Sequence, residues 1–346
     1  MNRANTVSNA PSSTPTISVI MANYNCEAYL KGAIRSVLNQ TLANIELILV
    51  DDGSSDGSVA LAEEIAQQDP RLRVFSGTRF GGPAPVRNHA LDQARGEWIA
   101  IVDSDDLIAP QRLEHMLEAA ISTKADIMID DLAIFQNEGE PDITTMLDGD
   151  LKDRPGRIME SEYIKANMMY GRGSQLGYAK PLIRRSSLDT NNIRYNESMR
   201  IGEDYDLIVR LLSAGARMMS LPEAMYFYRK HNRSISHRLD ANSLDALRAA
   251  AEAAMCQPTP HAEVTAAHAA RLKSIRRAIV FDGVIEALKQ KNIVRTLMLF
   301  RQDPTVLPLL RLPLLGKLQK VTGNPFARSD EDLTAELQQL RQQCEA

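Results

Sequence analysis

An acidic cluster follows an apolar stretch in the first third of the chain. Asp103-Ser104-Asp105 comes directly after the apolar run 98–102. Mg²⁺ and Mn²⁺ prefer hard oxygen ligands and often share their coordination shell with substrate phosphates. Two carboxylates placed two positions apart at the end of a strand can converge on one point if the backbone turns there. Asp103 and Asp105 are therefore candidate ligands of a divalent cation.

A second acidic pair, Asp51-Asp52, ends the predicted strand 45–50 in the same way. Two acidic clusters at one edge of a sheet repel each other unless a cation or a hydrogen-bond-donating ligand engages them. The alternative is structural, because Asp105 can also cap the next helix, whose start Pro110 indicates. The repetition of the pattern at two strand ends favours the binding interpretation.

Glu203 and Asp204 follow Gly202 and open a predicted amphipathic helix over 203–214. A carboxylate in this place can act as a general base, which typically contributes about 10²–10⁴-fold to a rate. Acidic residues are also favoured in the first turn of any helix for electrostatic reasons. The pair is therefore a catalytic candidate only in combination with the upstream acidic clusters.

Short apolar runs alternate with stretches of helical periodicity from Thr16 onward. Strands are predicted at 17–21, 45–50, 72–75, 98–102 and 127–129, and helices at 30–38, 59–66, 86–94, 111–123 and 203–214. Apolar strands separated by helices are typical of an α/β fold whose mostly parallel sheet is covered on both faces. Ligands of such sheets bind beyond the carboxyl ends of the strands, where each polar motif lies. The glycine-rich segment 76–82 lacks a phosphate-loop lysine and is predicted to be a turn.

Composition divides the chain into three regions. Residues 1–15 are rich in Asn, Ser, Thr and Pro and are predicted to form a flexible tail. Residues 16–240 form the α/β domain, with a regular half at 16–110 and a less regular half at 111–240. Residues 241–346 form a helical C-terminal region, with Ala-rich helices at 246–255 and 262–288.

The bulk properties exclude several classes of protein. The chain of 346 residues is 44% hydrophobic and 24% charged, as expected of a folded protein with a sizeable core. Its formal net charge of -4 argues against a general nucleic-acid binder. Three widely spaced cysteines make neither a disulfide framework nor a zinc cluster, so a reducing cytoplasm is the simpler location. No uninterrupted apolar run is long enough to predict a transmembrane helix.

Four motifs within residues 17–106 carry a family resemblance when taken together. They are Ile17-Ser18-Val19-Ile20 with Asn23-Tyr24-Asn25, Leu49-Val50-Asp51-Asp52-Gly53-Ser54-Ser55-Asp56, Val86-Arg87-Asn88, and Ile101-Val102-Asp103-Ser104-Asp105-Asp106. In this order and spacing they resemble family 2 glycosyltransferases of the GT-A fold. Gly202-Glu203-Asp204 resembles the Glu-Asp motif of that family, and the resemblance fades beyond about residue 237. The sequence as a whole resembles bacterial succinoglycan-type glucosyltransferases of exopolysaccharide synthesis.

The resemblance implies a role for each of these residues. Asp204, with Glu203 beside it, would be the catalytic base of an inverting enzyme. Asp105, with Asp103 and His231, would reach a Mn²⁺ or Mg²⁺ ion. The nucleotide-sugar would be bound by Asn23, Tyr24, Asn25, Asp51, Asp52, Arg87, Asp103 and Ser104.

The chemistry of individual side chains agrees with these roles and also leaves alternatives. The fork geometry of Arg87 suits phosphate, and an ionised aspartate such as Asp52 matches the imide N–H of uracil. However, Arg87 could be a surface arginine of a helix, and Tyr24 could be a packing residue. A lone histidine such as His231 is more often a surface or packing residue than a ligand.

The function implied is transfer of a sugar, glucose by the resemblance, from a UDP-sugar to a hydroxyl of a growing lipid-linked oligosaccharide. The half at 16–110 would bind the donor, and the half at 111–240 would bind the acceptor. A sugar-1-phosphate nucleotidyltransferase is an alternative, but it should carry a glycine-rich loop after its first strand. An aspartyl phosphatase should use an acidic pair on its first strand. A catalytically silent nucleotide-sugar-binding module is the third alternative.

The segment 294–321 is apolar but punctuated by basic residues. Its leucines, interleaved with Arg311, Lys317 and Lys320, are compatible with peripheral contact on the anionic inner face of the cell membrane. Pro304 and Pro308 interrupt a continuous helix. The alternative is that these leucines pack on the α/β domain or on a second copy in a homo-oligomer.

Overall fold

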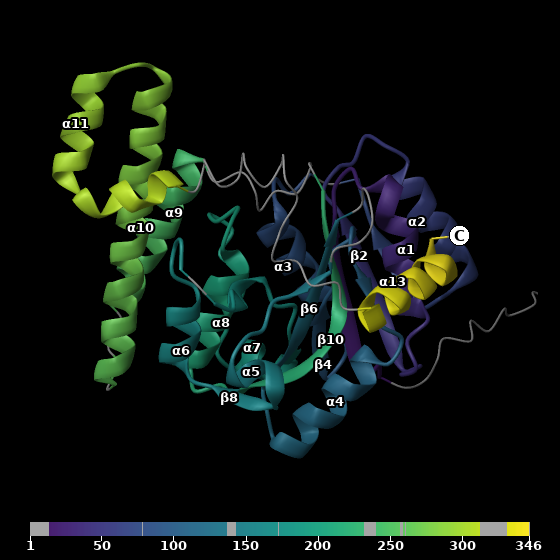
Figure 1. Ribbon diagram of the computed structural model, residues 1–346. Coiled ribbons are helices and arrows are strands. Elements are labelled where there is room, and N and C mark those ends of the chain that lie inside the picture. The colour runs from purple at the N-terminus through teal and green to yellow at the C-terminus, as the bar shows by residue number, and fades with distance from the viewer. Residues whose placement is uncertain are drawn as a thin grey trace, which may run out of the picture.

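The computed structural model describes residues 14–77, 79–136, 143–171, 173–231, 240–256, 259, 261–311 and 331–345. The expected tail at 1–15 therefore lies almost entirely outside the described residues, as does the second part of the segment 294–321. Figure 1 shows a central sheet with helices on both sides and a group of helices set apart at the left.

The described residues form one 10-stranded sheet with the strand order β3-β2-β1-β4-β9-β6-β10-β5, in which β7 also pairs with β6 and β8 with β10. The strands are β1 Ile17–Asn23, β2 Ile45–Asp51, β3 Leu72–Phe75, β4 Trp98–Ile101, β5 Leu107–Ile108, β6 Ile127–Gln136, β7 Thr144–Thr145, β8 Gly156–Ile158, β9 Leu182–Arg184 and β10 Met218–Lys230. The pairings β3-β2, β2-β1, β1-β4 and β6-β10 are parallel, whereas β5, β7, β8 and β9 run antiparallel to their partners. The expected mostly parallel sheet is confirmed.

Helices cover both faces of this sheet. They are α1 Glu27–Leu38, α2 Ser58–Gln68, α3 Pro83–Gln93, α4 Arg112–Thr123, α5 Asp150–Asp153, α6 Glu160–Ala166, α7 Arg185–Thr190, α8 Glu203–Ser213, α9 Ala241–Met255, α10 Ala262–Lys289, α11 Ile293–Gln302 and α13 Glu331–Cys344, with 3₁₀ helices η1 Leu176–Tyr178 and η3 Pro304–Leu310. In Figure 1, α1, α2 and α13 lie on one side of the sheet, and α3 and α8 lie on the other.

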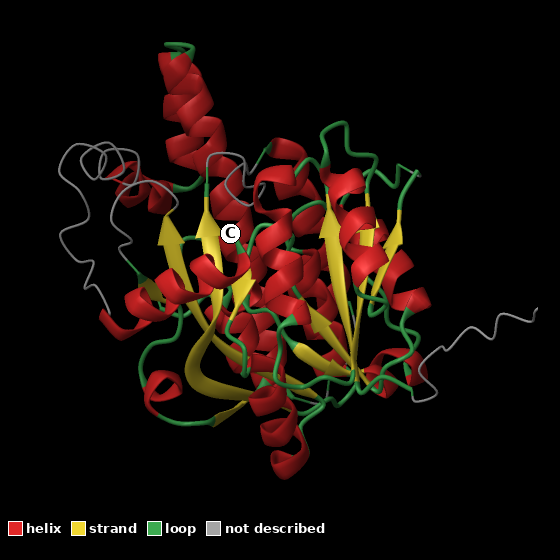
Figure 2. Ribbon diagram, turned by 90° about the vertical axis from the view of Figure 1, so that its right-hand side faces the viewer, coloured by secondary structure: helices red, strands yellow, loops and turns green. Residues whose placement is uncertain are grey.

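The first strands read as near-continuous apolar runs because both of their faces are buried. Every residue of β2 is buried, and so is all of β1 except Ala22. Their parallel register pairs Ile17 with Ile45 and Asn23 with Asp51. The polar residues that end the two strands therefore meet at the same edge of the sheet, the edge toward which the arrowheads of the long strands point in Figure 2.

Strand β6 is longer than the sequence analysis predicted. The expected strand ended at Ile129 because two aspartates follow, but β6 continues to Gln136. Arg112 donates two hydrogen bonds to Asp130, at 2.7 and 2.8 Å, and Asp131 accepts hydrogen bonds from three backbone N–H groups. Buried polar groups are tolerated when they are paired in this way, so the two acidic residues do not end the strand.

The helical C-terminal region begins with α9, one residue beyond the expected boundary at 240, although the division into domains itself stays a prediction. Helix α10 packs against α9, α11 and α6. Helix α13 instead packs on α1, and its Leu337, Leu340 and Cys344 belong to the same hydrophobic cluster as the α/β domain. No helix within the described ranges is long and apolar enough to cross a membrane.

Candidate active site

The carboxyl ends of the parallel strands open into a cavity of about 1490 Å³. The expected site residues that line it are Asn23, Tyr24, Asn25, Asp52, Arg87, Asp103, Ser104, Asp105, Glu203, Asp204 and His231. Asp51 is not among the lining residues. The structure therefore brings together residues from β1, α3, α8 and the loops after β2, β4 and β10, which are separated by up to about two hundred positions in the sequence.

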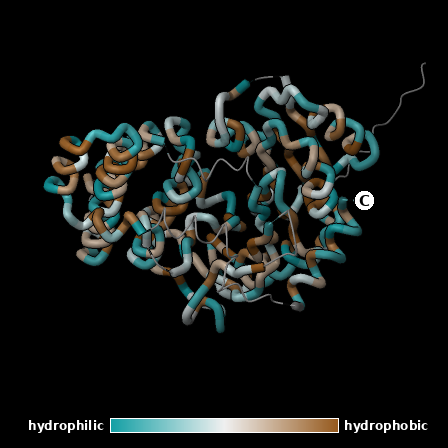
Figure 3. The backbone as a smooth tube through the Cα atoms, turned by 45° about the horizontal axis from the view of Figure 1, so that its top comes forward, coloured by the Kyte–Doolittle hydropathy of each residue, from teal (hydrophilic) through white to brown (hydrophobic). Residues whose placement is uncertain are grey.

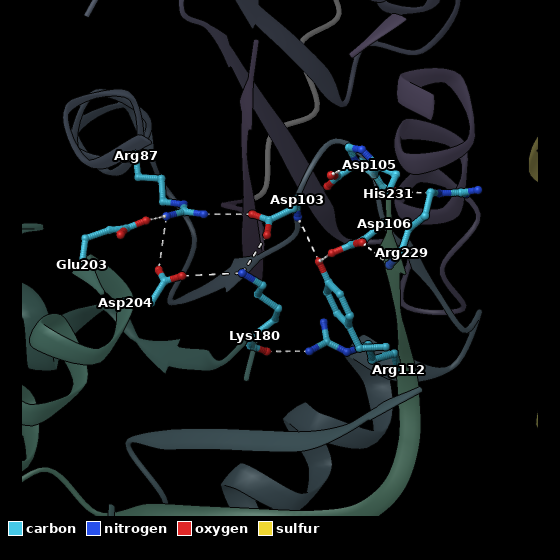
Figure 4. A network of polar contacts seen from close by, with 11 residues as sticks. Arg87, Asp103, Asp105, Asp106, Arg112, Lys180, Glu203, Asp204, Arg229 and His231 are labelled. Carbon is cyan, nitrogen blue, oxygen red and sulfur yellow. Dashed lines mark hydrogen bonds and ion pairs between the residues drawn. The ribbon is translucent and has the colours of Figure 1, made fainter. Parts of the chain in front are cut away.

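Two buried cations connect the acidic groups of this cavity (Figure 4). The guanidinium of Arg87, on α3, lies 2.7 Å from Glu203 Oε1, 3.3 Å from Asp204 Oδ1 and 2.9 Å from Asp103 Oδ1. The ammonium of Lys180, which precedes β9, lies 2.7 Å from Asp103 Oδ2 and 3.5 Å from Asp204 Oδ2. The carboxylate after β4 and the carboxylate that opens α8 are thus held across the same two cations.

This arrangement shifts the pKa values of Asp103 and Glu203 in opposite directions. Burial opposes ionisation of Asp103, but Lys180 and Arg87 outweigh it and hold the pKa of Asp103 well below its usual range. Burial and the neighbouring Asp204 carboxylate raise the pKa of Glu203 to about 7, against the opposing effect of Arg87. The ion pairs thus favour the anionic form of Asp103, whereas burial favours the protonated form of Glu203.

The loop after β4 concentrates three carboxylates. Ligand oxygens of Asp103, Asp105 and Asp106 lie within 4.8 Å of one another. Asp105 Oδ2 is 2.8 Å from His231 Nε2. Asp106 is fully buried, and burial together with Asp105 and Asp103 raises its pKa well above the usual range. An oxygen-rich cluster with this degree of mutual repulsion has the donor atoms that Mg²⁺ or Mn²⁺ requires.

Asp106 is held by the protein itself. The hydroxyl of Tyr226 donates to Asp106 Oδ2 at 2.7 Å, and the backbone N–H of Arg229 donates to Asp106 Oδ1 at 2.7 Å. The same tyrosine oxygen accepts the backbone N–H of Asp103 at 3.1 Å. Asp106 thus ties the loop after β4 to strand β10 and leaves Asp105 facing the cavity.

Asp52 and Tyr24 also line the cavity. Asp52 Oδ1 accepts the backbone N–H groups of Phe80 and Gly81, so Asp52 fixes part of the predicted turn at 76–82. The Tyr24 side chain is 48% exposed, and the guanidinium carbon of Arg79 lies 5.9 Å from its ring centroid. An exposed aromatic ring that lines a cavity is available to contact a planar base.

The side chains of Asp51 and Asn25 form hydrogen bonds that stabilise the loop after β2. Asp51 accepts hydrogen bonds from the Asn23 side chain at 2.7 Å and from the backbone N–H groups of Gly53 and Ser54. Asn25, in the left-handed region at φ 49°, accepts the backbone N–H of Ser55. Asp51 is 1% exposed and its carboxylate is engaged within the loop, so its direct contact with the nucleotide stays a prediction.

Sequence reasoning missed Lys180. In the sequence, Lys180 is simply followed by Pro181 and a short apolar run. This pattern is common in proteins and does not indicate a functional lysine. The side chain is nearly fully buried, and Asp103 and Asp204 raise its pKa although burial opposes this. Lys180 reaches the site only because the antiparallel strand β9 inserts between β4 and β6.

Comparisons with known proteins agree with this geometry. A sequence profile of Glycosyl transferase family 2 matches residues 18–185. The succinoglycan biosynthesis protein ExoO of Rhizobium meliloti (strain 1021) is 32% identical over 309 residues, which cover 89% of this chain and 88% of that protein. The chain belongs to glycosyltransferase family 2. The succinoglycan biosynthesis protein ExoU of the same organism is 31% identical over 226 residues, or 64% of the transferase and 65% of ExoU.

Solved structures resemble the transferase in fold. TarS 1–349 of S. aureus in complex with UDP-GlcNAc has a TM-score of 0.62 at 19% identity, with 83% of the transferase and 91% of that chain covered. The mannosyltransferase PcManGT of Pyrobaculum calidifontis in complex with GDP-Man and Mn²⁺ has a TM-score of 0.56 at 16% identity, with 99% and 91% covered. The expected GT-A type fold with a helical C-terminal part is confirmed.

Proposed function

We propose that the transferase moves a sugar from a UDP-sugar to a hydroxyl group with inversion, and that Asp204 is the catalytic base. The observation that carries this proposal is that Asp204 and Asp103 share the same two buried cations across one cavity. Displacement of a diphosphate requires a base for the attacking hydroxyl and a cation for the leaving group. Asp204 would be the base, and the acidic loop after β4 would bind the cation.

Asp204 would accept the proton of the acceptor hydroxyl while that oxygen forms a bond to the anomeric carbon of the donor sugar. The bond from this carbon to the diphosphate oxygen breaks, and its electron pair leaves with UDP. Arg87 and Lys180 orient the Asp204 carboxylate for this step, because each contacts one of its oxygens. Arg87 was expected to contact phosphate, but its guanidinium is directed at three carboxylates and acts in this proposal as a positioning group.

Asp105, with Asp103 and His231 beside it, would hold Mn²⁺ or Mg²⁺. The bound ion supplies positive charge against the diphosphate leaving group. Asp52 would accept the uracil N–H, and Tyr24 would contact the base with its exposed ring. Asn23, Asn25 and Ser104 line the same part of the cavity. Asp51 would contribute through the loop that it shapes.

The pathway and the substrates are also proposals. Two relatives, ExoO and ExoU, are succinoglycan biosynthesis proteins, and the structural neighbour TarS was solved with UDP-GlcNAc. These likenesses support a role in exopolysaccharide synthesis with a UDP-sugar as donor. A lipid-linked oligosaccharide acceptor at the cytoplasmic face of the membrane is a further part of the proposal. Glucose is the donor sugar that the resemblance favours.

The direct test is a screen of UDP-sugars with a lipid-linked acceptor pool and Mn²⁺, in which UDP release is measured. We expect release that depends on acceptor and cation and is fastest with UDP-glucose. Pyrophosphate release from UTP and a sugar 1-phosphate would instead identify a nucleotidyltransferase. Binding of UDP-sugar without turnover in any combination would identify a silent binding module.

Helix α11 carries the surface that would rest on a lipid headgroup layer. Its side chains Ile293, Val294, Leu297 and Met298 are 73%, 66%, 63% and 67% exposed and fall on one helical face. The exposed basic residues around them are Lys289, Lys291, Arg295 and Arg301. Apolar side chains edged by cations match an anionic lipid surface. Figure 3 shows, at the left, how hydrophobic and hydrophilic residues alternate along the backbone of the C-terminal helices.

Flotation with anionic phosphatidylglycerol vesicles tests this surface. We expect the pair of substitutions Leu297→Glu and Met298→Glu to abolish flotation. The matched control pair, Ala269→Glu and Ala270→Glu on the exposed face of α10, should float like the parent. Equal flotation of both double variants would remove α11 from the proposal.

A further inference from the structure

Helix α13 connects the far end of this chain to the loop that carries Asp105. The helix lies against α1 at the right of Figure 1, and Leu337 and Leu340 anchor it in the main hydrophobic cluster. Glu345 follows the helix directly. Its Oε1 lies 2.5 Å from Arg229 Nη2, and its Oε2 accepts a hydrogen bond from Arg341 at 2.9 Å.

Arg229 transmits this contact to the acidic loop. Its Nε donates to the backbone carbonyl of Asp105 at 2.8 Å, and its backbone N–H donates to the Asp106 carboxylate. The side chain is 1% exposed, and its guanidinium lies 4.7 Å from the ring centroid of Tyr29 and 4.9 Å from that of Phe135. A guanidinium enclosed by two rings, a carboxylate and a carbonyl has little freedom to move.

A glycine in α1 makes room for Glu345. Gly32 lies in the interior of the helix, where glycine is less favourable than alanine. A Cβ atom at this position would lie 2.9 Å from Glu345 Cγ and 3.3 Å from Leu107 Cδ2. The close approach of Glu345 thus explains why a helix-destabilising residue occupies this place, and it is independent of the ion pair with Arg229.

We propose that Glu345 is a positioning residue for the divalent-cation site and acts through Arg229 on the main chain of Asp105. The proposal rests on the assignment of Asp105 as a cation ligand. By fixing the Arg229 guanidinium, the Glu345 carboxylate also fixes the Asp105 carbonyl that accepts from it. The position of this carbonyl in turn sets the direction of the Asp105 side chain. Groups that orient ligands in this way typically change metal affinity or activity by about 10–100-fold when they are altered.

The experiment compares three variants with the full-length parent. Glu345→Gln removes the negative charge, Glu345→Asp keeps the charge on a shorter side chain, and Gly32→Ala displaces Glu345 without changing any charge. Asp332→Asn, at an exposed position of α13, is the matched control for the loss of one negative charge. The readout is the dissociation constant for Mn²⁺, measured from the loss of the free-ion electron paramagnetic resonance signal. It requires no turnover.

We expect Glu345→Gln and Gly32→Ala to raise the Mn²⁺ dissociation constant on the order of 10-fold, Glu345→Asp to raise it less, and Asp332→Asn to leave it unchanged. At saturating Mn²⁺, kcat should stay close to the parent value, because the residue acts on affinity. Thermal unfolding identifies any variant that fails to fold, in which case the remaining two decide the result.

Parent-like Mn²⁺ affinity in the folded Glu345 and Gly32 variants would overturn the proposal, as would a parent that binds no Mn²⁺. Failure of the proposed function looks different. In that case the parent binds Mn²⁺, and the variants still differ from it, but no donor is turned over. The two outcomes are separated because the binding measurement does not depend on sugar transfer.

Discussion

Replacement of Asp204 by asparagine is expected to lower kcat by about 10²–10⁴-fold, the usual contribution of a general base. Asparagine has nearly the same shape but cannot accept the proton of the acceptor hydroxyl. Because the substitution keeps the shape of the side chain and its contacts with Arg87 and Lys180, the dissociation constant of the UDP-sugar should change little. Steady-state UDP release and calorimetric donor binding measure the two quantities separately.

Asp206→Asn is the matched control for this variant. Asp206 lies in the same helical turn, and its carboxylate accepts hydrogen bonds from Arg210 at 2.9 and 2.7 Å. The control removes the same charge at nearly the same place but leaves the cavity intact, so its kcat should stay near that of the parent. Similar losses in both variants would mean that the charge at the start of α8, and not proton transfer at Asp204, determines the rate.

Replacement of Asp105 by asparagine is expected to abolish cation-dependent turnover and to weaken Mn²⁺ binding while the fold remains. An amide oxygen carries no net charge and is a poorer ligand for a hard dication than a carboxylate. The backbone contacts of the loop, from Arg229 to the Asp105 carbonyl and from Tyr226 to Asp106, do not involve the substituted group. Thermal unfolding should therefore stay close to that of the parent.

Asp92→Asn serves as the control for Asp105→Asn. The Asp92 side chain is 63% exposed, pairs with Arg194 at 3.4 Å and is not among the residues that line the cavity. It should bind Mn²⁺ and turn over like the parent. If Asp105→Asn retained Mn²⁺-stimulated activity, the assignment of the cation to this loop would be wrong.

The sequence predicts the donor half of the fold well because its signals are local. Apolar strands alternate with helices, and parallel strands necessarily bring their carboxyl ends to one edge. The pattern of residues alone therefore places Asp52, Asp103 and Asp105 together. Asp204 joins them only through the family resemblance, since nothing local distinguishes a catalytic aspartate from an ordinary residue of a first helical turn.

The features that the sequence does not predict depend on contacts between distant segments. Lys180 gains its place beside Asp103 from the insertion of an antiparallel strand. Asp51 is engaged by the backbone N–H groups of Gly53 and Ser54 in its own loop. The continuation of β6 past Asp130 is accompanied by the pairing of Asp130 with Arg112, and Glu345, which follows α13, approaches α1 closely at Gly32. Hydrophobic periodicity contains no information about such pairings.

The configuration of the product tests the central claim most directly. With an α-linked UDP-sugar donor, the anomeric proton of the newly transferred sugar can be followed by NMR from the first turnover. Attack on the face opposite to UDP, with Asp204 taking the proton of the hydroxyl, predicts a β-linked product. An α-linked product formed at the same rate would contradict a single displacement and remove the base role from Asp204.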